Sequence, residues 1–190
     1  LSLVATGGTG TGAVSWQVVT GTCTVSGSTL TPGDAGSSCV VKATKAQDTN
    51  YLVVESAVTS IDVLRANQNA MTVSSVTATY GQNLSLTISG GSGTGALSWQ
   101  VVSGSCTVSS STLTPGDAGS SCVVHVTKAQ DTNYFVADSA DTSVTINKAP
   151  QASLTVTSLT ATYGQTLTLT ATGGSGIGGI NWTKVSGTCS

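Results

Sequence analysis

The chain has 190 residues, of which only 7% are charged, and its formal net charge is -2 at pH 7. Soluble domains average about 25% charged residues, so surface polarity here must come from Ser and Thr, about a third of the sequence. Six Lys and Arg residues are too few for a nucleic-acid-binding face, and no apolar run approaches the roughly 18 residues of a membrane-spanning helix. One His and eight carboxylates leave little material for acid–base catalysis, so we predict neither an enzyme nor a cofactor.

A period of 83 residues runs through the whole sequence. The residues that recur at this spacing are Cys23, Cys106 and Cys189; Cys39 and Cys122; Trp16, Trp99 and Trp182; and Tyr51 and Tyr134. Residues 29–39 return letter for letter as 112–122, and residues 45–51 return as 128–134. Because no gap is needed anywhere, the period corresponds to one structural unit in tandem.

The phase of this period divides the chain into three repeats. Residues 67–149 form a complete second repeat. Residues 1–66 form a first repeat without its opening strand, and residues 150–190 form the opening strands of a third. Both boundaries of the chain fall inside a repeat, which predicts that the sequence is part of a longer array.

Within a repeat the hydrophobic pattern is that of strands. Apolar and polar residues alternate over 84–88 and 167–170, and no window carries a capped helical stripe. The strands that we predict in the second repeat lie at 72–79, 84–89, 96–102, 105–109, 111–114, 121–127 and 142–147. The Gly-rich residues 90–95 and the turn at 115–117 separate some of them. Seven short strands in one period predict an all-β fold of tandem Ig-like sandwiches.

The cysteines predict one disulfide in each repeat. Cys23 and Cys39 are 16 residues apart within the first repeat, as Cys106 and Cys122 are within the second. A disulfide across a loop of this size stabilises a small domain by roughly 3 kcal/mol. A zinc site is the alternative, but the sequence has no C-x-x-C and no His at ligand spacing. We expect the partner of Cys189 to lie beyond the end of the chain, and disulfides indicate an oxidising, extracellular compartment.

The recurring aromatic residues are predicted to lie in the core. One Trp per repeat falls on the third predicted strand, and a Trp at such a position is more often core than a platform for sugars. The predicted core aromatics are Trp16, Trp99, Trp182, Tyr51 and Tyr134.

An ordered set of motifs resembles a known class of repeat. It comprises A-T-Y-G-Q at 78–82, G-G-S-G at 90–93, G-S-C-T at 104–107 and K-A-Q-D-T-N-Y at 128–134. Together these motifs look like the tandem bacterial Ig-like repeats of large surface proteins, the MBG-type and adhesin-stalk repeats. The resemblance covers the whole chain and implies an extracellular, non-catalytic spacer. It departs from antibody domains, because the cysteines are too close in sequence to join the two central strands.

Two sequence patterns resemble a phosphate-binding loop and a calcium-binding loop. The Gly-rich residues 7–12 and 90–95 lack the helix and the Lys that a phosphate loop requires, so we interpret them as hairpin turns. The Asp-Thr-Asn segments at 48–50 and 131–133 place oxygen ligands as calcium loops do, with Asp34 or Asp117 as the extra ligand. Calcium needs six to eight oxygens, and turn chemistry explains the same residues, so we predict no metal.

The sequence shows no set of residues that could act with His125 in catalysis. It stands where the first repeat has Lys42. We therefore interpret it as an exposed strand residue.

The leading functional hypothesis is structural: a stalk or filament outside a bacterial cell, with short linkers such as 148–151, where Pro150 limits bending. The alternative is an adhesin whose repeats themselves bind a glycan or protein ligand with multivalent avidity. Low charge and strand edges with few Lys or Pro residues also predict association with identical repeats or chains. One form of this association is a strand such as 153–159 that completes the sheet of another chain.

Overall fold

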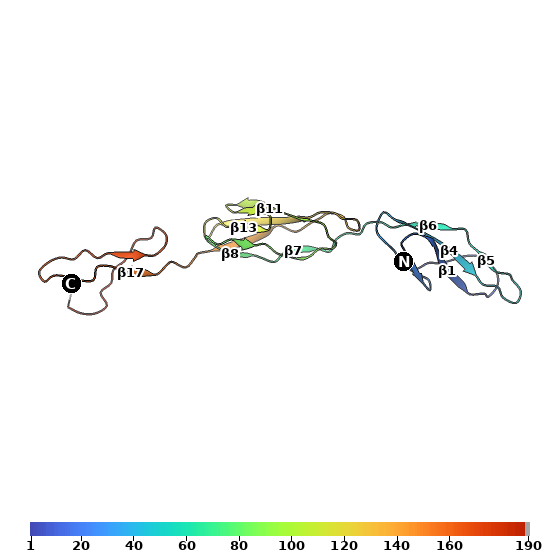
Figure 1. The fold of residues 1–190 in the computed structure, drawn as a ribbon, viewed down its shortest axis with the longest axis horizontal. Helices are drawn as coiled ribbons and strands as arrows, with labels where there is room; N and C mark the ends of the chain where they lie inside the picture. Colours follow the sequence, from blue (N-terminus) through green and yellow to red (C-terminus); the bar gives the residue numbers. More distant parts are fainter. Residues whose placement is uncertain (189–190) are drawn as a thin grey trace.

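The computed structural model describes residues 1–188, which form three β-rich bodies in a row, in sequence order (Figure 1). The three bodies correspond to the three repeats. The described residues contain strands, turns and irregular segments without an α-helix, so the predicted all-β class is confirmed. None of them forms a helix long and apolar enough to cross a membrane.

The second repeat holds its strands in two main sheets and one two-stranded pair. The first sheet has the order β11-β14-β16-β8, with β15 also paired to β14; the second has the order β12-β13-β9, and β10 pairs with β7. The strands are β7 (Met71–Val73), β8 (Thr77–Thr79), β9 (Leu84–Ser85), β10 (Ile88–Gly90), β11 (Leu97–Gly104), β12 (Thr107–Ser109), β13 (Thr112–Thr114), β14 (Ser121–Lys128), β15 (Ala137–Asp138) and β16 (Thr142–Asn147). The third, sixth and seventh predicted strands thus share one sheet, as in an Ig-like sandwich.

Two predicted strands are each broken into two. The predicted strand 72–79 becomes β7, which pairs with β10, and β8, which runs parallel to β16 in a different sheet. The break follows from side-chain chemistry, because the hydroxyl of Ser75 accepts the backbone N–H of Thr87 and so replaces a ladder bond. The predicted strand 84–89 divides into β9 and β10, which pair with β13 and β7 respectively.

Strand β15 has no counterpart in the sequence prediction. It pairs with β14 at Thr127 and Lys128, and the hydroxyl of Thr127 donates to the carboxylate of Asp138. A two-residue strand is too short to display an alternating pattern, so only its contacts reveal it.

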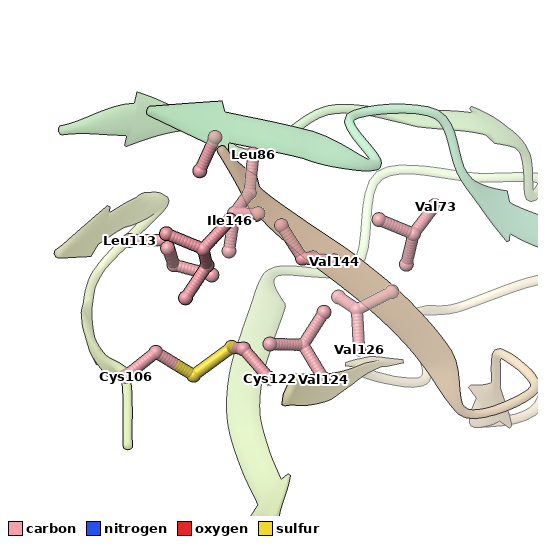
Figure 2. Close-up of a cluster of buried hydrophobic side chains, with 10 residues drawn as sticks. Val73, Leu86, Cys106, Leu113, Cys122, Val124, Val126, Val144 and Ile146 are labelled. Atoms are coloured by element: carbon pink, nitrogen blue, oxygen red, sulfur yellow. A yellow bond between two sulfur atoms is a disulfide. The ribbon is translucent and has the colours of Figure 1, made fainter. Parts of the chain in front are cut away.

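The core of the second repeat lies between its sheets, with the disulfide at one edge (Figure 2). Its buried members are Val73, Ala78, Leu86, Cys106, Leu113, Cys122, Val124, Val126, Val144 and Ile146. Each fully buried aliphatic side chain stabilises the fold by about 1.5–3 kcal/mol relative to exposure. The predicted disulfide between Cys106 and Cys122 is present.

The first repeat reproduces most of this arrangement with a smaller core. Strand β4 pairs with β1, β5 and β6, and β2 pairs with β3. The bounds are β1 (Val14–Thr20), β2 (Thr24–Ser26), β3 (Thr29–Thr31), β4 (Ser38–Lys45), β5 (Val54–Glu55) and β6 (Thr59–Asp62). The Cys23–Cys39 disulfide is also present, and it lies in the core with Leu3, Leu30 and Val41.

The described part of the third repeat consists of one strand pair, β17 (Leu154–Val156) with β18 (Ala171–Gly173). The alternating residues 167–170 are not a strand, which corrects the sequence prediction. Their counterparts in the second repeat pair with β13, and the positions equivalent to β13 lie beyond residue 190. Cys189 lies outside the described residues.

Removing the second disulfide tests its contribution to the fold. Replacing both Cys106 and Cys122 by Ala is expected to lower the free energy of unfolding of the second repeat by about 3 kcal/mol, because the unfolded chain regains its loop entropy. Amide hydrogen exchange of β14 measures this change for the second repeat separately. The matched variant Cys23→Ala/Cys39→Ala should accelerate exchange in β4 and not in β14. Unchanged protection in β14 of the first variant would contradict the expectation.

Candidate functional site: the joint between two repeats

The Asp-Thr-Asn segment of the second repeat forms a tight loop around one carboxylate. Asp131 Oδ1 accepts the backbone N–H groups of Asn133 and Tyr134, both at 2.9 Å. Asp131 Oδ2 accepts the N–H of Thr94 at 2.6 Å, which ties this loop to the Gly-rich loop. These bonds, led by that from Thr94, hold the pKa of the Asp131 carboxyl below its ordinary value of 3.8, although partial desolvation opposes the shift.

A glycine is required where the two loops meet. A Cβ on Gly93 would lie 2.0 Å from Asp131 Oδ2, and its φ of +71° is also unfavourable for other residues. The Gly-rich residues therefore serve as a turn that packs against Asp131, in accordance with the hairpin interpretation.

The first repeat builds the same loop. Asp48 accepts the N–H groups of Asn50, Thr11 and Tyr51, and these bonds, with that from Asn50 the largest, lower its pKa. The identical sequence thus folds identically in both repeats.

The loop of the second repeat contacts the first repeat through Asn133. Its side-chain Oδ1 accepts the N–H of Ala35 at 2.7 Å, and its Nδ2 donates to Asp34 Oδ1 at 3.0 Å. Asp34 and Ala35 belong to the turn 32–36 that precedes β4, and Ser37 stabilises this turn by donating to the carbonyl of Asp34. One asparagine therefore bonds both the backbone and a side chain of the neighbouring repeat.

The linker between the two repeats is bonded to the same loop. Ala66 and Tyr134 form an isolated parallel bridge, in which the N–H of Ala66 donates to Asn133 and its carbonyl accepts from Phe135. Arg65 reaches the carbonyl of Thr132 and the side chain of Gln130, both at 3.3 Å.

Gln68 extends this bonding beyond the linker. Its Nε2 donates to the carbonyl of Phe135 at 2.8 Å, and its Oε1 accepts from Ser92. We define the joint as Asp34, Ala35, residues 65–68 and residues 130–135.

Asp34 lies within hydrogen-bonding distance of Asn133, as a shared calcium site would require. The oxygen atoms of these loops, however, are already occupied by hydrogen bonds. Both oxygens of Asp131 already accept N–H or O–H donors, and the Asn133 oxygen accepts from Ala35. In residues 1–188 no three His, Cys, Asp or Glu side chains gather where they could hold a metal ion. The contacts are those of turn chemistry and interdomain bonding.

His125 lies on β14 opposite Gln100 and is partly buried rather than fully exposed. Its Nδ1 lies 3.4 Å from a carboxylate oxygen of Asp141, which is itself largely exposed. At the corresponding place in the first repeat, Lys42 pairs with Glu55 at 2.9 Å. Position 125 and the equivalent position 42 thus each lie beside a surface carboxylate.

The predicted core aromatics divide into two groups. Trp16 and Trp99 pack against the cores of their repeats, and Tyr134 is half-buried beside the linker. The prediction that Tyr51 and Trp182 are core residues is wrong, because these side chains are 49% and 41% exposed. Tyr134 is covered by the linker at Ala66, whereas the residues that correspond to this linker for Tyr51, and to β14 for Trp182, lie outside the sequence.

Comparison with known proteins provides no relative: no family model, curated protein or solved structure matches the chain. The functional argument therefore depends on the geometry of the joint.

Acid should weaken the loop at the joint. Asp131 has a lower pKa in the folded chain than in the unfolded chain, so its stabilising contribution is present at neutral pH. It is lost as the pH falls below 3.8 and through the lower folded value. Denaturant unfolding from neutral pH to about pH 2 should show a steeper acid loss for the wild type than for Asp131→Asn. The exposed carboxylate variant Asp62→Asn is the charge-matched control, and equal acid dependence in Asp131→Asn and the wild type would contradict the expectation.

Proposed function

We propose that this chain is a structural segment of a bacterial extracellular stalk or filament, a mechanical spacer without catalysis. The observation that carries the proposal is the joint, where Asn133 of one repeat bonds Asp34 and Ala35 of the repeat before it. A spacer must transmit position and load from one unit to the next. A bonded joint provides this, whereas a free linker would leave neighbouring repeats to reorient independently.

The joint restrains bending from two sides. The linker is held by the bridge between Ala66 and Tyr134, and the turn beside it is held by Asn133. Hydrogen bonds of this kind contribute about 0.5–1.5 kcal/mol each. Several of them acting between the same two bodies favour one relative orientation over a broad distribution.

The disulfides suit a segment under tension. When a repeat is stretched from its two ends, the residues between its cysteines cannot extend, because the covalent bond bypasses them. In the second repeat this protected segment starts after β11 and includes β12 and β13. Unfolding under load is therefore limited in length, and the repeat can refold from a restricted chain.

The same covalent bonds support an extracellular compartment. Two disulfides within 190 residues are typical of proteins in oxidising environments. The resemblance to adhesin-stalk repeats supports a bacterial surface as the location.

Loosening the joint tests its role. Asn133→Ala removes two interdomain hydrogen bonds and is expected to weaken the joint by about 1–3 kcal/mol. Small-angle X-ray scattering of a dilute sample should then show a smaller radius of gyration and a broader distance distribution, because bent conformers become populated. Asn50→Ala makes the same change at the equivalent position of the first repeat, where the described chain offers its side chain no bond, and should leave the scattering unchanged. Identical curves for Asn133→Ala and wild type would contradict the role of the joint.

Single-molecule pulling tests the mechanical role. Under oxidising conditions each complete repeat should unfold with a contour length shortened by the disulfide-bounded segment. Adding a reductant should lengthen the step by about 50 Å, because 16 residues at about 3.4 Å each replace the 5.7 Å that the disulfide spans between its Cα atoms. The Cys106→Ala/Cys122→Ala variant should give the longer step without reductant. A full-length step in the oxidised wild type would argue against a load-limiting disulfide.

A further inference from the structure

Tension along a row of repeats reaches the second repeat at both of its ends. The chain enters this repeat through the linker at 65–68 and leaves it at residues 148–151, directly after β16. Entry and exit lie at opposite ends of the body (Figure 1). The strands closest to these two points therefore receive the force first, and their contacts decide how the repeat responds to it.

Two strands near these ends lie side by side and run in the same direction. Strand β8 pairs in parallel with residues 145–147 of β16. Bonds on either side extend this contact, because the N–H of Thr145 donates to the carbonyl of Val76 at 2.9 Å and the N–H of Tyr80 donates to the carbonyl of Asn147 at 2.8 Å. We call β8 together with residues 145–147 the parallel pair.

The direction of the two strands determines how force acts on their hydrogen bonds. Force from the entry pulls on the N-terminal end of β8, whereas force from the exit pulls on the C-terminal end of β16. In a parallel pair these ends point in opposite directions, so the strands are drawn past each other and all the bonds between them resist together. In an antiparallel pair the same two ends would lie at one side, and the bonds would break one after another.

The parallel pair also connects the entry to the exit by the shortest route through the repeat. Residues 80–141, which include the disulfide between Cys106 and Cys122, lie between the two strands in sequence. While β8 remains bonded to β16, force passes directly from one strand to the other and these residues stay outside the load path. Separating β7 from β10 releases only the residues before β8, so it leaves this route intact.

Burial strengthens the parallel pair. Ala78 and Ile146 lie opposite each other at its centre and are only 3% and 2% exposed. The side chain of Ile146 belongs to the core cluster together with Val144 of the same strand (Figure 2). Water has little access to the centre of the pair, so hydrogen bonds that break there are not immediately replaced by bonds to solvent.

We propose that the parallel pair sets the force at which the second repeat unfolds and keeps the disulfide outside the load path until the two strands separate. This proposal rests on the mechanical role proposed above and names the contacts that perform it. Under tension the parallel pair separates first, the strands between β8 and β16 follow, and only then does the disulfide limit the extension.

The direction of pulling tests the proposal without changing the core. In a Cys189→Ser background, the pair of substitutions Asn67→Cys and Lys148→Cys places handles at the entry and the exit. The pair Gln82→Cys and Lys148→Cys places both handles beyond the C-terminal ends of the two strands, so that the bonds open one at a time. All three handle positions are exposed. The repeat should unfold at a clearly higher force in the first geometry, and equal forces in the two geometries would overturn the proposal.

Deleting one hydrogen bond of the contact tests it a second time. Tyr80 is half-exposed and precedes Gly81, which has a φ of +72°, in the turn that the N–H of Gln82 closes on the carbonyl of Thr79. Pro before Gly is common in such a turn, so Tyr80→Pro preserves the turn and removes the N–H that bonds Asn147. With handles at the entry and the exit, this variant should unfold about fivefold faster at constant force.

The matched control lies inside the disulfide-bounded segment. Val108 of β12 packs against the same core, so Val108→Ala should lower the stability measured with denaturant. It should leave the unfolding rate under force unchanged, because β12 lies outside the load path. Acceleration by Val108→Ala equal to that by Tyr80→Pro would show a general loss of stability and refute the proposal.

The results also separate this proposal from the spacer role. If the two pulling geometries give equal forces while Asn133→Ala still broadens the scattering, the assignment to the parallel pair is wrong and the role of the joint stands. The opposite pair of results removes the role of the joint alone.

Discussion

The pairing of the opening strand with the edge at residues 88–90 buries the apolar side chains with which the second repeat begins. Where β7 is seated, Met71 and Val73 close the core, and the strand then crosses to the other sheet and covers Ile146. The buried cluster of the first repeat surrounds its disulfide.

The Asp-Thr-Asn segment at 131–133 both forms a local loop and contacts the neighbouring repeat. Asp131 gathers the backbone N–H groups of its own loop, and this fixes the loop so that the side chain of Asn133 points to the preceding repeat. The aspartate therefore positions the loop, and the asparagine makes the interdomain contact. The same residues at 48–50 form the same hydrogen bonds without this contact, so the loop does not depend on docking for its conformation.

Much of the fold could be predicted because its signals are local or periodic. Three signals predict an all-β tandem fold: the alternation within single strands, the 16-residue spacing of the cysteines and the recurrence at 83 residues. They also predict one disulfide for each pair of cysteines at that spacing. The prediction was wrong where a side chain interrupts a ladder, as Ser75 does between β7 and β8. It was also wrong at Tyr51 and Trp182, because burial depends on neighbours that periodicity alone does not supply.

The sequence by itself determined the secondary-structure class, the 83-residue period, the disulfide partners and the turn chemistry of the Asp-Thr-Asn segments. Each of these depends on residues close in sequence or on exact repetition. Only the tertiary structure decided what Asn133 contacts, because Ala35 is 98 residues away and no local pattern connects them. It likewise decided which of two identical tyrosines is covered, since cover depends on long-range packing rather than on the residue itself.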